Sequence, residues 1–246
     1  MELAATWLSI IGASPAGAYA YAFIGGIVPA LVWLVFFLRE DRLHPEPRKL
    51  LIFTFIAGMS CVIFVLPVQR FAYGFLTGGS LLLAWAFIEE LFKYWAAYLV
   101  VLWQSAVDEP MDPVIYMITA ALGFAALENA LFMSGPLLSG NPTEALITGN
   151  LRFIGAALLH VVASASIGIA LALSFYRKSK YKRLYFLTGF ILSVLLHTIF
   201  NFFIMESNGG EVLIVFSFVW IGVILLLLLF ERIKLIKKPL PANIFK

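Results

Sequence analysis

The sequence has little cysteine and little charge, and both shortages exclude whole classes of protein. Its 246 residues include one cysteine, Cys61, which excludes a disulfide framework and a zinc site built from several cysteines. Charged residues make up 13% of the chain and hydrophobic residues 62%, so polar side chains are too few to cover a soluble globule. Basic residues are missing near the N-terminus, where Glu2 is the first charge. We therefore expect no signal peptide and a first span that is retained.

Apolar runs of about 20 residues are abundant instead, and this is the length that crosses a bilayer core as a helix. A lone strand or loop could not satisfy its backbone groups in lipid, so every span should be helical. The sequence predicts an all-α, polytopic transmembrane bundle of about seven spans in the cell membrane, in contact with the lipid bilayer. No linker or low-complexity stretch divides the chain, so we expect a single domain, 1–246. The predicted spans are 19–38, 50–68, 81–103, 114–134, 151–175, 184–205 and 212–230, and a shorter apolar segment, 3–12, is expected at the membrane interface.

Basic residues are distributed unevenly between the two sides of these spans. The first connection, the fifth connection and the C-terminal tail carry four, five and five Lys or Arg residues, whereas the other side has only Arg70 and Arg152. Cytoplasmic segments carry the excess of basic residues, so the N-terminus should lie outside and the C-terminus in the cytoplasm. The net charge of +3 then reflects topology and anionic headgroups, and we expect no nucleic-acid partner.

Ionisable side chains in the middle of the spans are the feature that points to function. Glu89, Glu90 and Lys93 lie in the third span, and each such charge costs roughly 2.5–3.5 kcal/mol near a bilayer centre. Counted at about 1.5 Å per residue from the outer end of each span, polar residues of three further spans fall in the same outer layer. They are Glu128 in the fourth span, His160 in the fifth, and His197 and Asn201 in the sixth. This convergence predicts a buried polar cavity that water reaches from outside.

Each of these residues taken alone also has a purely structural explanation. A Glu with a Lys one turn further on can be a self-neutralising pair, and His160, His197, Ser164 or Asn201 can simply join helices by hydrogen bonds. The combination favours a chemical role, because Lys93 cannot neutralise two adjacent carboxylates and one of them can then exchange a proton with water. A proton-coupled transporter would gather similar residues. Such proteins have spans interrupted by Gly or Pro, however, and the third to sixth predicted spans lack proline.

Four short motifs lie in order on successive spans. They are Glu89-Glu90-Leu-Phe-Lys93 (EExxK), Phe124-Ala-Ala-Leu-Glu128 (FxxxE), His160-Val-Val-Ala-Ser164 (HxxxS) and His197-Thr-Ile-Phe-Asn201 (HxxxN). Together they resemble the PrsW family of intramembrane proteases, relatives of the CAAX prenyl endopeptidases and of bacteriocin-processing enzymes. The connection from Arg39 to Pro47 is also similar to the first cytoplasmic loop of that family.

The resemblance implies hydrolysis of a membrane-protein substrate at the outer side of the membrane, in the best-known case the first cut in an anti-sigma factor. By analogy with the CAAX enzymes, Glu89 or Glu90 would deprotonate a water molecule. His160 would orient that water or carry a proton. His197 and Asn201 would donate hydrogen bonds to the oxyanion of the tetrahedral intermediate.

The same resemblance leaves two points open. Lys93 would hold the second glutamate ionised, and Glu128 stands where the CAAX enzymes have a histidine, which leaves room for a metal ion bound by Glu and His. The expected mechanism needs no metal or other cofactor. A non-catalytic scaffold is the other possibility, because the scaffold subunit of γ-secretase is a remote relative with degenerate motifs, but the complete motif set here favours a protease.

Overall fold

A computed structural model describes residues 14–42, 44–206 and 212–238, and the regular elements in these residues are all helices. The prediction of an all-α, polytopic helix bundle is confirmed, whereas the predicted interfacial segment 3–12 lies outside the described residues. The helices are α2 (Pro15–Leu38), α3 (Arg48–Tyr73), α4 (Gly78–Ala97), α5 (Asp112–Leu138), α6 (Pro142–Leu151), α7 (Ala157–Leu173), α8 (Ser179–Glu206) and α9 (Val212–Lys234). A 3₁₀ turn (Arg39–Asp41) follows α2, a π-helical turn (Tyr98–Leu102) follows α4, and another (Arg152–Ala156) joins α6 to α7.

Each predicted span corresponds to one long helix, with α6 and α7 forming a single rod. Six of these, all except α4, are long and apolar enough to cross a membrane. Helix α4 falls short because Glu89, Glu90 and Lys93 lie in its middle. The observed helices differ most from the predicted spans between the fourth and fifth spans, because α5 extends to Leu138 and helix begins again at Pro142. The Asn141 side chain caps α6 by accepting a hydrogen bond from the Glu144 amide. Pro142 begins the helix, and its missing N–H costs nothing there, because the first amides of a helix have no partner within the helix.

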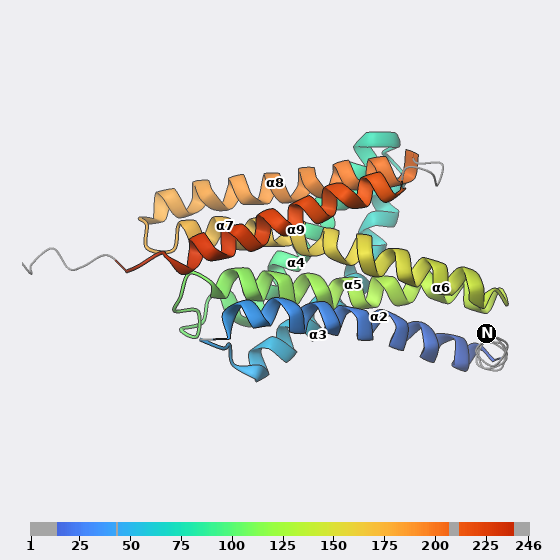
Figure 1. The fold of residues 1–246 in the computed structure, drawn as a ribbon. Coiled ribbons are helices and arrows are strands. Elements are labelled where there is room, and N and C mark those ends of the chain that lie inside the picture. Colours follow the sequence, from blue (N-terminus) through green and yellow to red (C-terminus); the bar gives the residue numbers. More distant parts are fainter. Residues whose placement is uncertain (1–13, 43, 207–211, 239–246) are drawn as a thin grey trace, which may run out of the picture.

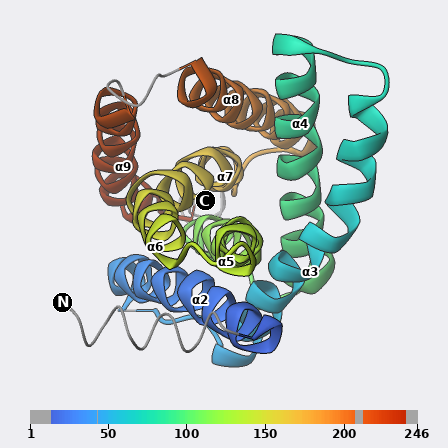
Figure 2. The same ribbon diagram turned by 90° about the vertical axis from the view of Figure 1, so that its right-hand side faces the viewer.

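The bundle has a buried centre and a lipid-like outer layer. Viewed along its axis, α5 and α7 lie in the middle and α2, α3, α4, α8 and α9 surround them (Figure 2). Helix α5 is buried along most of its length, whereas the outer helices expose most of theirs. The exposed residues of the outer helices are mainly large and apolar, such as Phe64, Ile214 and Phe218. That pattern suits a surface in contact with acyl chains.

Helices α3 and α5 cross with their backbones in contact. A Cβ atom added at Gly58 would overlap the carbonyl oxygen of Ala120, and one added at Gly123 would overlap that of Phe55. Small residues permit such close approach between membrane helices. The crossing fixes the central helix against α3, and α3 in turn packs on α4 as a hairpin that is steeply inclined to the other helices (Figures 1 and 2).

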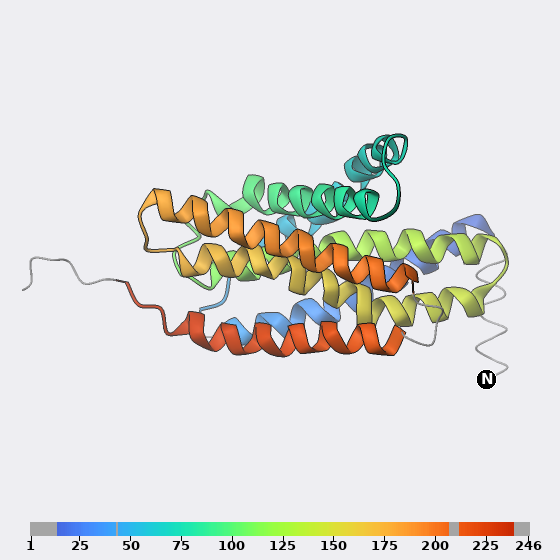
Figure 3. The ribbon, with the colours of Figure 1, turned by 90° about the horizontal axis from the view of Figure 1, so that it is seen from above.

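The connections gather at the two ends of the bundle. The connection from α2 to α3, that from α4 to α5, that from α7 to α8, and the end of α9 all lie at one end (Figures 1 and 3). This is the arrangement that the alternating spans predicted. It brings chain segments that are distant in sequence into contact at that end.

Candidate active site

Helix α4 supplies two adjacent carboxylates and a lysine to the middle of the bundle. Glu89, Glu90 and Lys93 are buried, and their spacing places both glutamates within one helical turn of the lysine. The Lys93 Nζ atom lies 2.7 Å from Glu90 Oε1 and 3.6 Å from Glu89 Oε2. The two glutamates therefore share one ammonium unequally, and their remaining contacts differ.

Glu90 is fully satisfied by hydrogen bonds from three helices. Its Oε1 accepts from Lys93 and lies 2.8 Å from Nδ1 of His197 on α8. Its Oε2 accepts from the hydroxyls of Ser164 on α7 at 2.6 Å and Ser193 on α8 at 2.9 Å. The side chain is completely buried. Glu90 is therefore a hydrogen-bonded anchor that joins α4, α7 and α8.

Glu89 is held at one oxygen only. Its Oε1 accepts from Gln69 Nε2 on α3 at 2.8 Å, and the Gln69 carbonyl in turn accepts from the Trp85 indole at 3.1 Å. Its buried Oε2 has no hydrogen-bond partner and lies 3.6 Å from both Lys93 Nζ and His197 Nε2. In the tautomer in which His197 Nδ1 donates to the Glu90 carboxylate, the uncharged ring has its lone pair on Nε2. In that tautomer two acceptor atoms face each other across a gap that suits a proton donor or a cation.

His160 has both ring nitrogens engaged. Lys93 Nζ lies 2.7 Å from Nδ1, and because an ammonium only donates, Nδ1 is the acceptor and Nε2 carries the hydrogen. Nε2 then donates to Glu128 Oε2 at 3.0 Å. The Phe124 ring lies 4.5 Å from Lys93 Nζ and 5.5 Å from the His160 ring, and so covers this pair. The FxxxE and HxxxS motifs therefore close around the lysine of the EExxK motif.

Glu128 marks the edge of the cluster. Its side chain is 19% exposed, and it also accepts from the Arg152 guanidinium, whose Nε donates to Asn129 Oδ1. Arg152 begins the π-helical turn between α6 and α7. Such turns shift the register of a helix and are frequent at functional sites. Here the turn precedes His160 by one helical turn, so Arg152 and His160 meet the same carboxylate.

Direct contacts join all of the site residues predicted from the sequence except Asn201. Asn201 is half-buried one turn after His197 on α8, and no hydrogen bond joins its amide to another described residue. Three contributors were not predicted: Gln69, Ser193 and Arg152. Ser193 lies one turn before His197, so helical spacing could have indicated it, whereas Arg152 was assigned only to topology and nothing in the sequence pairs Gln69 with Glu89.

The residue types in this cluster fit a metal ion. Glu89, His160 and His197 each offer a ligand atom, and these atoms lie within 4.8 Å of one another. Two histidines and a glutamate are a known ligand set for catalytic zinc. Against this, Lys93 and Glu128 already occupy both nitrogens of His160, so an ion could use His160 only by displacing one of them.

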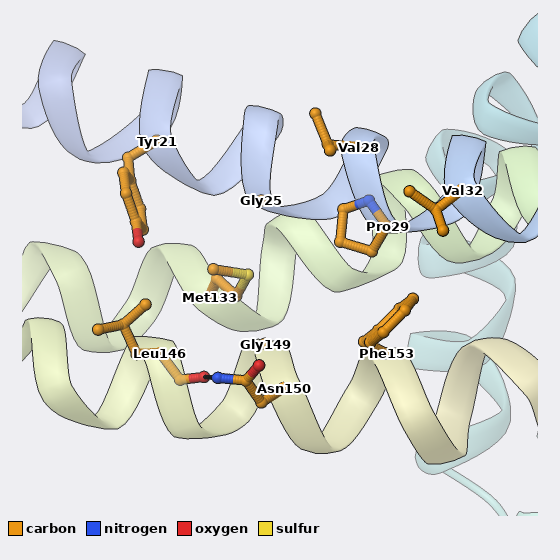
Figure 4. Close-up of a pocket in the computed structure, with 10 residues that line it drawn as sticks. All are labelled: Tyr21, Gly25, Val28, Pro29, Val32, Met133, Leu146, Gly149, Asn150 and Phe153. Carbon is orange, nitrogen blue, oxygen red and sulfur yellow. Dashed lines mark hydrogen bonds between the residues drawn. The ribbon is translucent and has the colours of Figure 1, made fainter.

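The cluster is separate from the apolar pocket of 260 Å³ between α2, α5 and α6 (Figure 4). Met133 lies at the centre of that pocket, with Gly25 on one side and Gly149 on the other, and Tyr21 and Asn150 are among the few polar groups in its lining. The wall contains no carboxylate or imidazole, the groups that most often act in acid and base catalysis. We therefore assign the chemistry to the buried cluster.

Comparison with known proteins agrees with the motifs in this cluster. The family described as PrsW family intramembrane metalloprotease matches residues 46–229. The chain belongs to the PrsW family. Protease PrsW of Geobacillus kaustophilus is 27% identical over 194 residues, which cover 74% of this chain and 79% of that protein. Protease PrsW of Clostridioides difficile is 26% identical over 205 residues, covering 80% and 84%, and that of Bacillus subtilis is 30% identical over 117 residues, covering 45% and 52%.

Membership of the PrsW family makes this chain an intramembrane protease that acts on a membrane protein, and the six apolar helices agree with a multi-pass protein of the membrane. The PrsW match includes all four motifs and every residue of the cluster described above. No solved structure matches the chain at a significant level.

Proposed function

We propose that this PrsW protease hydrolyses a peptide bond in a membrane-protein substrate with a water molecule activated by Glu89. The observation that carries the proposal is Glu89 Oε2, a buried carboxylate oxygen that has no hydrogen-bond partner and lies 3.6 Å from His197 Nε2. A general base needs a free lone pair within reach of water. Glu90 has none, because four donors already occupy its two oxygens.

The proposed reaction has two steps, and each step moves one proton. Glu89 Oε2 takes a proton from water while the water oxygen attacks the peptide carbonyl carbon. The proton then passes, directly or through His197 Nε2, to the amide nitrogen, and the C–N bond breaks to release an amine and a carboxylic acid. Lys93 and Glu90 hold Glu89 and His197 in place, and His160 positions Lys93 instead of taking the proton itself.

Asn201 is the proposed donor to the oxyanion. It lies one turn beyond His197 on α8, and its amide is not engaged by another described residue. A neutral amide is a good hydrogen-bond donor and a poor metal ligand. His197 can join it only after taking up the proton, because its neutral ring has no hydrogen on Nε2 when Nδ1 donates to Glu90.

The proposed substrate is a single-span membrane protein such as an anti-sigma factor, cut in the outer half of the membrane. Support comes from the uneven distribution of basic residues, which favours an external N-terminus and a cytoplasmic tail. Reporter domains test this orientation. A reporter fused after Lys246 should be cytoplasmic and one inserted between α5 and α6 external; finding both on the same side would refute it.

Substitution of Glu89 tests the assignment of the base. The assay needs a substrate that the wild-type chain cleaves. Tagged single-span anti-sigma factors of the host are therefore first co-expressed with the wild-type chain, and one that is cleaved is used for the variants. Glu89→Gln should reduce cleavage by about 10²–10⁴-fold and leave thermal stability unchanged, since Gln69 can still donate to the new amide oxygen. Glu144→Gln, an exposed glutamate that bonds Asn141, is the control and should cleave normally. Near-normal cleavage by Glu89→Gln would refute the proposed base.

A metal-dependent mechanism is the second candidate, favoured by the Glu89, His160 and His197 ligand set. A bound ion would polarise the peptide carbonyl and make water more acidic. We favour the metal-free route because Lys93 lies 2.7 Å from one nitrogen of His160 and Glu128 holds the other. Activity in detergent should survive EDTA and 1,10-phenanthroline. Loss of activity that added zinc restores would establish the metal-dependent mechanism and leave the protease function in place.

A further inference from the structure

A second group of buried carboxylates lies at the end of the bundle where α2 ends and α5 begins. Asp41 ends the 3₁₀ turn after α2, Glu46 lies in the connection to α3, and Asp112 is the first residue of α5. Their exposed fractions are 8%, 8% and 2%. One carboxylate oxygen of each lies within 4.8 Å of the other two. We call these three residues the acidic cluster.

The acidic cluster has hydrogen-bond donors but no cationic partner among the described residues. Asp112 Oδ2 accepts from the amides of Asp108 and Glu109 at 2.8 Å each, and Glu46 Oε2 accepts from the Tyr116 hydroxyl. Asp41 Oδ2, although buried, has no hydrogen-bond partner. Three ionised carboxylates at this spacing are therefore unstable without added positive charge.

Two basic residues near the acidic cluster are paired with other carboxylates. Lys234 on α9 pairs with Glu40 at 3.1 Å and with Glu231 at 2.6 Å. His44 pairs with Glu109 at 2.7 Å. No described basic residue forms an ion pair with a carboxylate of the acidic cluster, so a cation from solution can supply the positive charge that it lacks.

A route for small ions leads to the acidic cluster. Asp41 forms part of the wall of a cavity of 570 Å³ between the first connection, the α4–α5 connection and the end of α9. Charged side chains, including Arg39, Glu40 and Glu231, make up much of the remaining wall. An aqueous ion can therefore reach Asp41 without crossing the apolar core.

We propose that Asp41, Glu46 and Asp112 bind one divalent cation that prefers oxygen ligands, Ca²⁺ or Mg²⁺. Carboxylate oxygens are the ligands that these ions select, and the cluster contains no sulfur or imidazole ligand that would favour zinc. A Ca²⁺ ion about 2.3–2.6 Å from each oxygen accommodates ligand atoms up to 4.8 Å apart, and water completes its coordination. Mg²⁺, with shorter bonds, requires the carboxylates to move closer together.

The bound ion would tie the end of α2 and the first connection to the start of α5. Helix α5 also carries Glu128, 16 residues further on and roughly 24 Å away at about 1.5 Å per residue. The site is therefore distinct from the proposed catalytic cluster. It stabilises the end of the helix on which part of that cluster is built.

Thermal unfolding of the full chain in detergent tests the site. After EDTA treatment and dialysis, CaCl₂ or MgCl₂ is added, with KCl at equal ionic strength as the reference. A saturating ion should raise the wild-type Tm by about 5 °C, and the ion that acts at lower concentration is the preferred one. Asp41→Asn should lose this rise. Glu40→Gln, which changes a neighbouring carboxylate that pairs with Lys234, should keep it.

Three outcomes would overturn the proposal. The first is a wild-type Tm that neither ion raises, as expected if protons alone neutralise the cluster. The second is an equal rise in the Tm of Asp41→Asn, and the third is the loss of the Tm rise in Glu40→Gln. If Asp41→Asn does not fold, Glu46→Gln replaces it with the same expectation. Equilibrium dialysis with ⁴⁵Ca²⁺ counts the Ca²⁺ ions bound per chain. The site would also be refuted if the wild-type chain bound clearly less than one Ca²⁺ ion at millimolar Ca²⁺ and Mg²⁺ had no effect on its Tm.

Discussion

Two groups of three carboxylates lie in the same helix bundle, all of them buried except the partly exposed Glu128, and the groups differ in their cationic partners. The group around Glu90 has Lys93 and Arg152 as ion-pair partners, together with two imidazoles. The acidic cluster of Asp41, Glu46 and Asp112 has only neutral donors among the described residues. A buried anion needs a proton, a cationic side chain or a bound ion. This contrast underlies the two proposals, proton transfer in the first group and cation binding in the second.

The difference predicts opposite responses to the loss of one charge. Removing a cation from the first group leaves an unpaired anion in the core, which is costly. Removing an anion from the acidic cluster relieves repulsion when no divalent ion is bound, so Asp41→Asn should be no less stable than wild type in EDTA.

Lys93→Met should destabilise the chain by about 3–5 kcal/mol, because Glu90 would then be buried without its ammonium partner. The double variant Glu90→Gln/Lys93→Met should recover most of this loss, since it removes both charges. Unfolding of detergent-solubilised protein, followed by near-UV circular dichroism, measures both. If the double variant is no more stable than Lys93→Met, charge pairing is not what Lys93 contributes, and the contrast with the acidic cluster fails.

Asn201→Ala should slow the chemical step by about 10²–10³-fold, equivalent to roughly 2.7–4 kcal/mol, if its amide stabilises the oxyanion. The effect should fall on kcat and leave KM nearly unchanged, because the interaction strengthens only in the transition state. Thr198→Ala is a suitable control, since the Thr198 hydroxyl donates to the Val194 carbonyl of its own helix. Equal rates for Asn201→Ala and Thr198→Ala would remove Asn201 from the proposed mechanism.

The sequence was most informative where one physical requirement decides the outcome. Long apolar runs must be helical in lipid, which is why all seven predicted spans correspond to helices. Ionisable residues within these runs are costly, so Glu89, Glu128, His160 and His197 could be picked out individually and placed at similar depth. Which residue contacts which could not be predicted, because it depends on the angles at which helices cross.

The residues that escaped prediction share a different physical basis. Gln69 and Ser193 are ordinary polar residues that become site residues only through Glu89 and Glu90, their tertiary partners. The acidic cluster was missed because Asp41 and Glu46 belong to a polar connection, where hydropathy predicts exposure. Their burial results from packing against the start of α5, which sequence spacing does not report.

Helix α5 connects the two groups, and its crossing with α3 holds it in place. Gly123→Ala would force a Cβ atom into the carbonyl oxygen of Phe55, so α3 and α5 would have to move apart. Overpacking of this kind costs about 1–3 kcal/mol, and the shift should weaken both substrate cleavage and the Tm rise produced by the divalent ion. Gly79→Ala is the matched control, because nothing lies within 4 Å of an added Cβ at that position. We expect Gly79→Ala to be neutral or slightly stabilising, since alanine loses less backbone entropy on folding than glycine. A Gly123→Ala chain as stable as Gly79→Ala, with unchanged cleavage and ion response, would show that the close crossing of α3 and α5 is not needed to position either group.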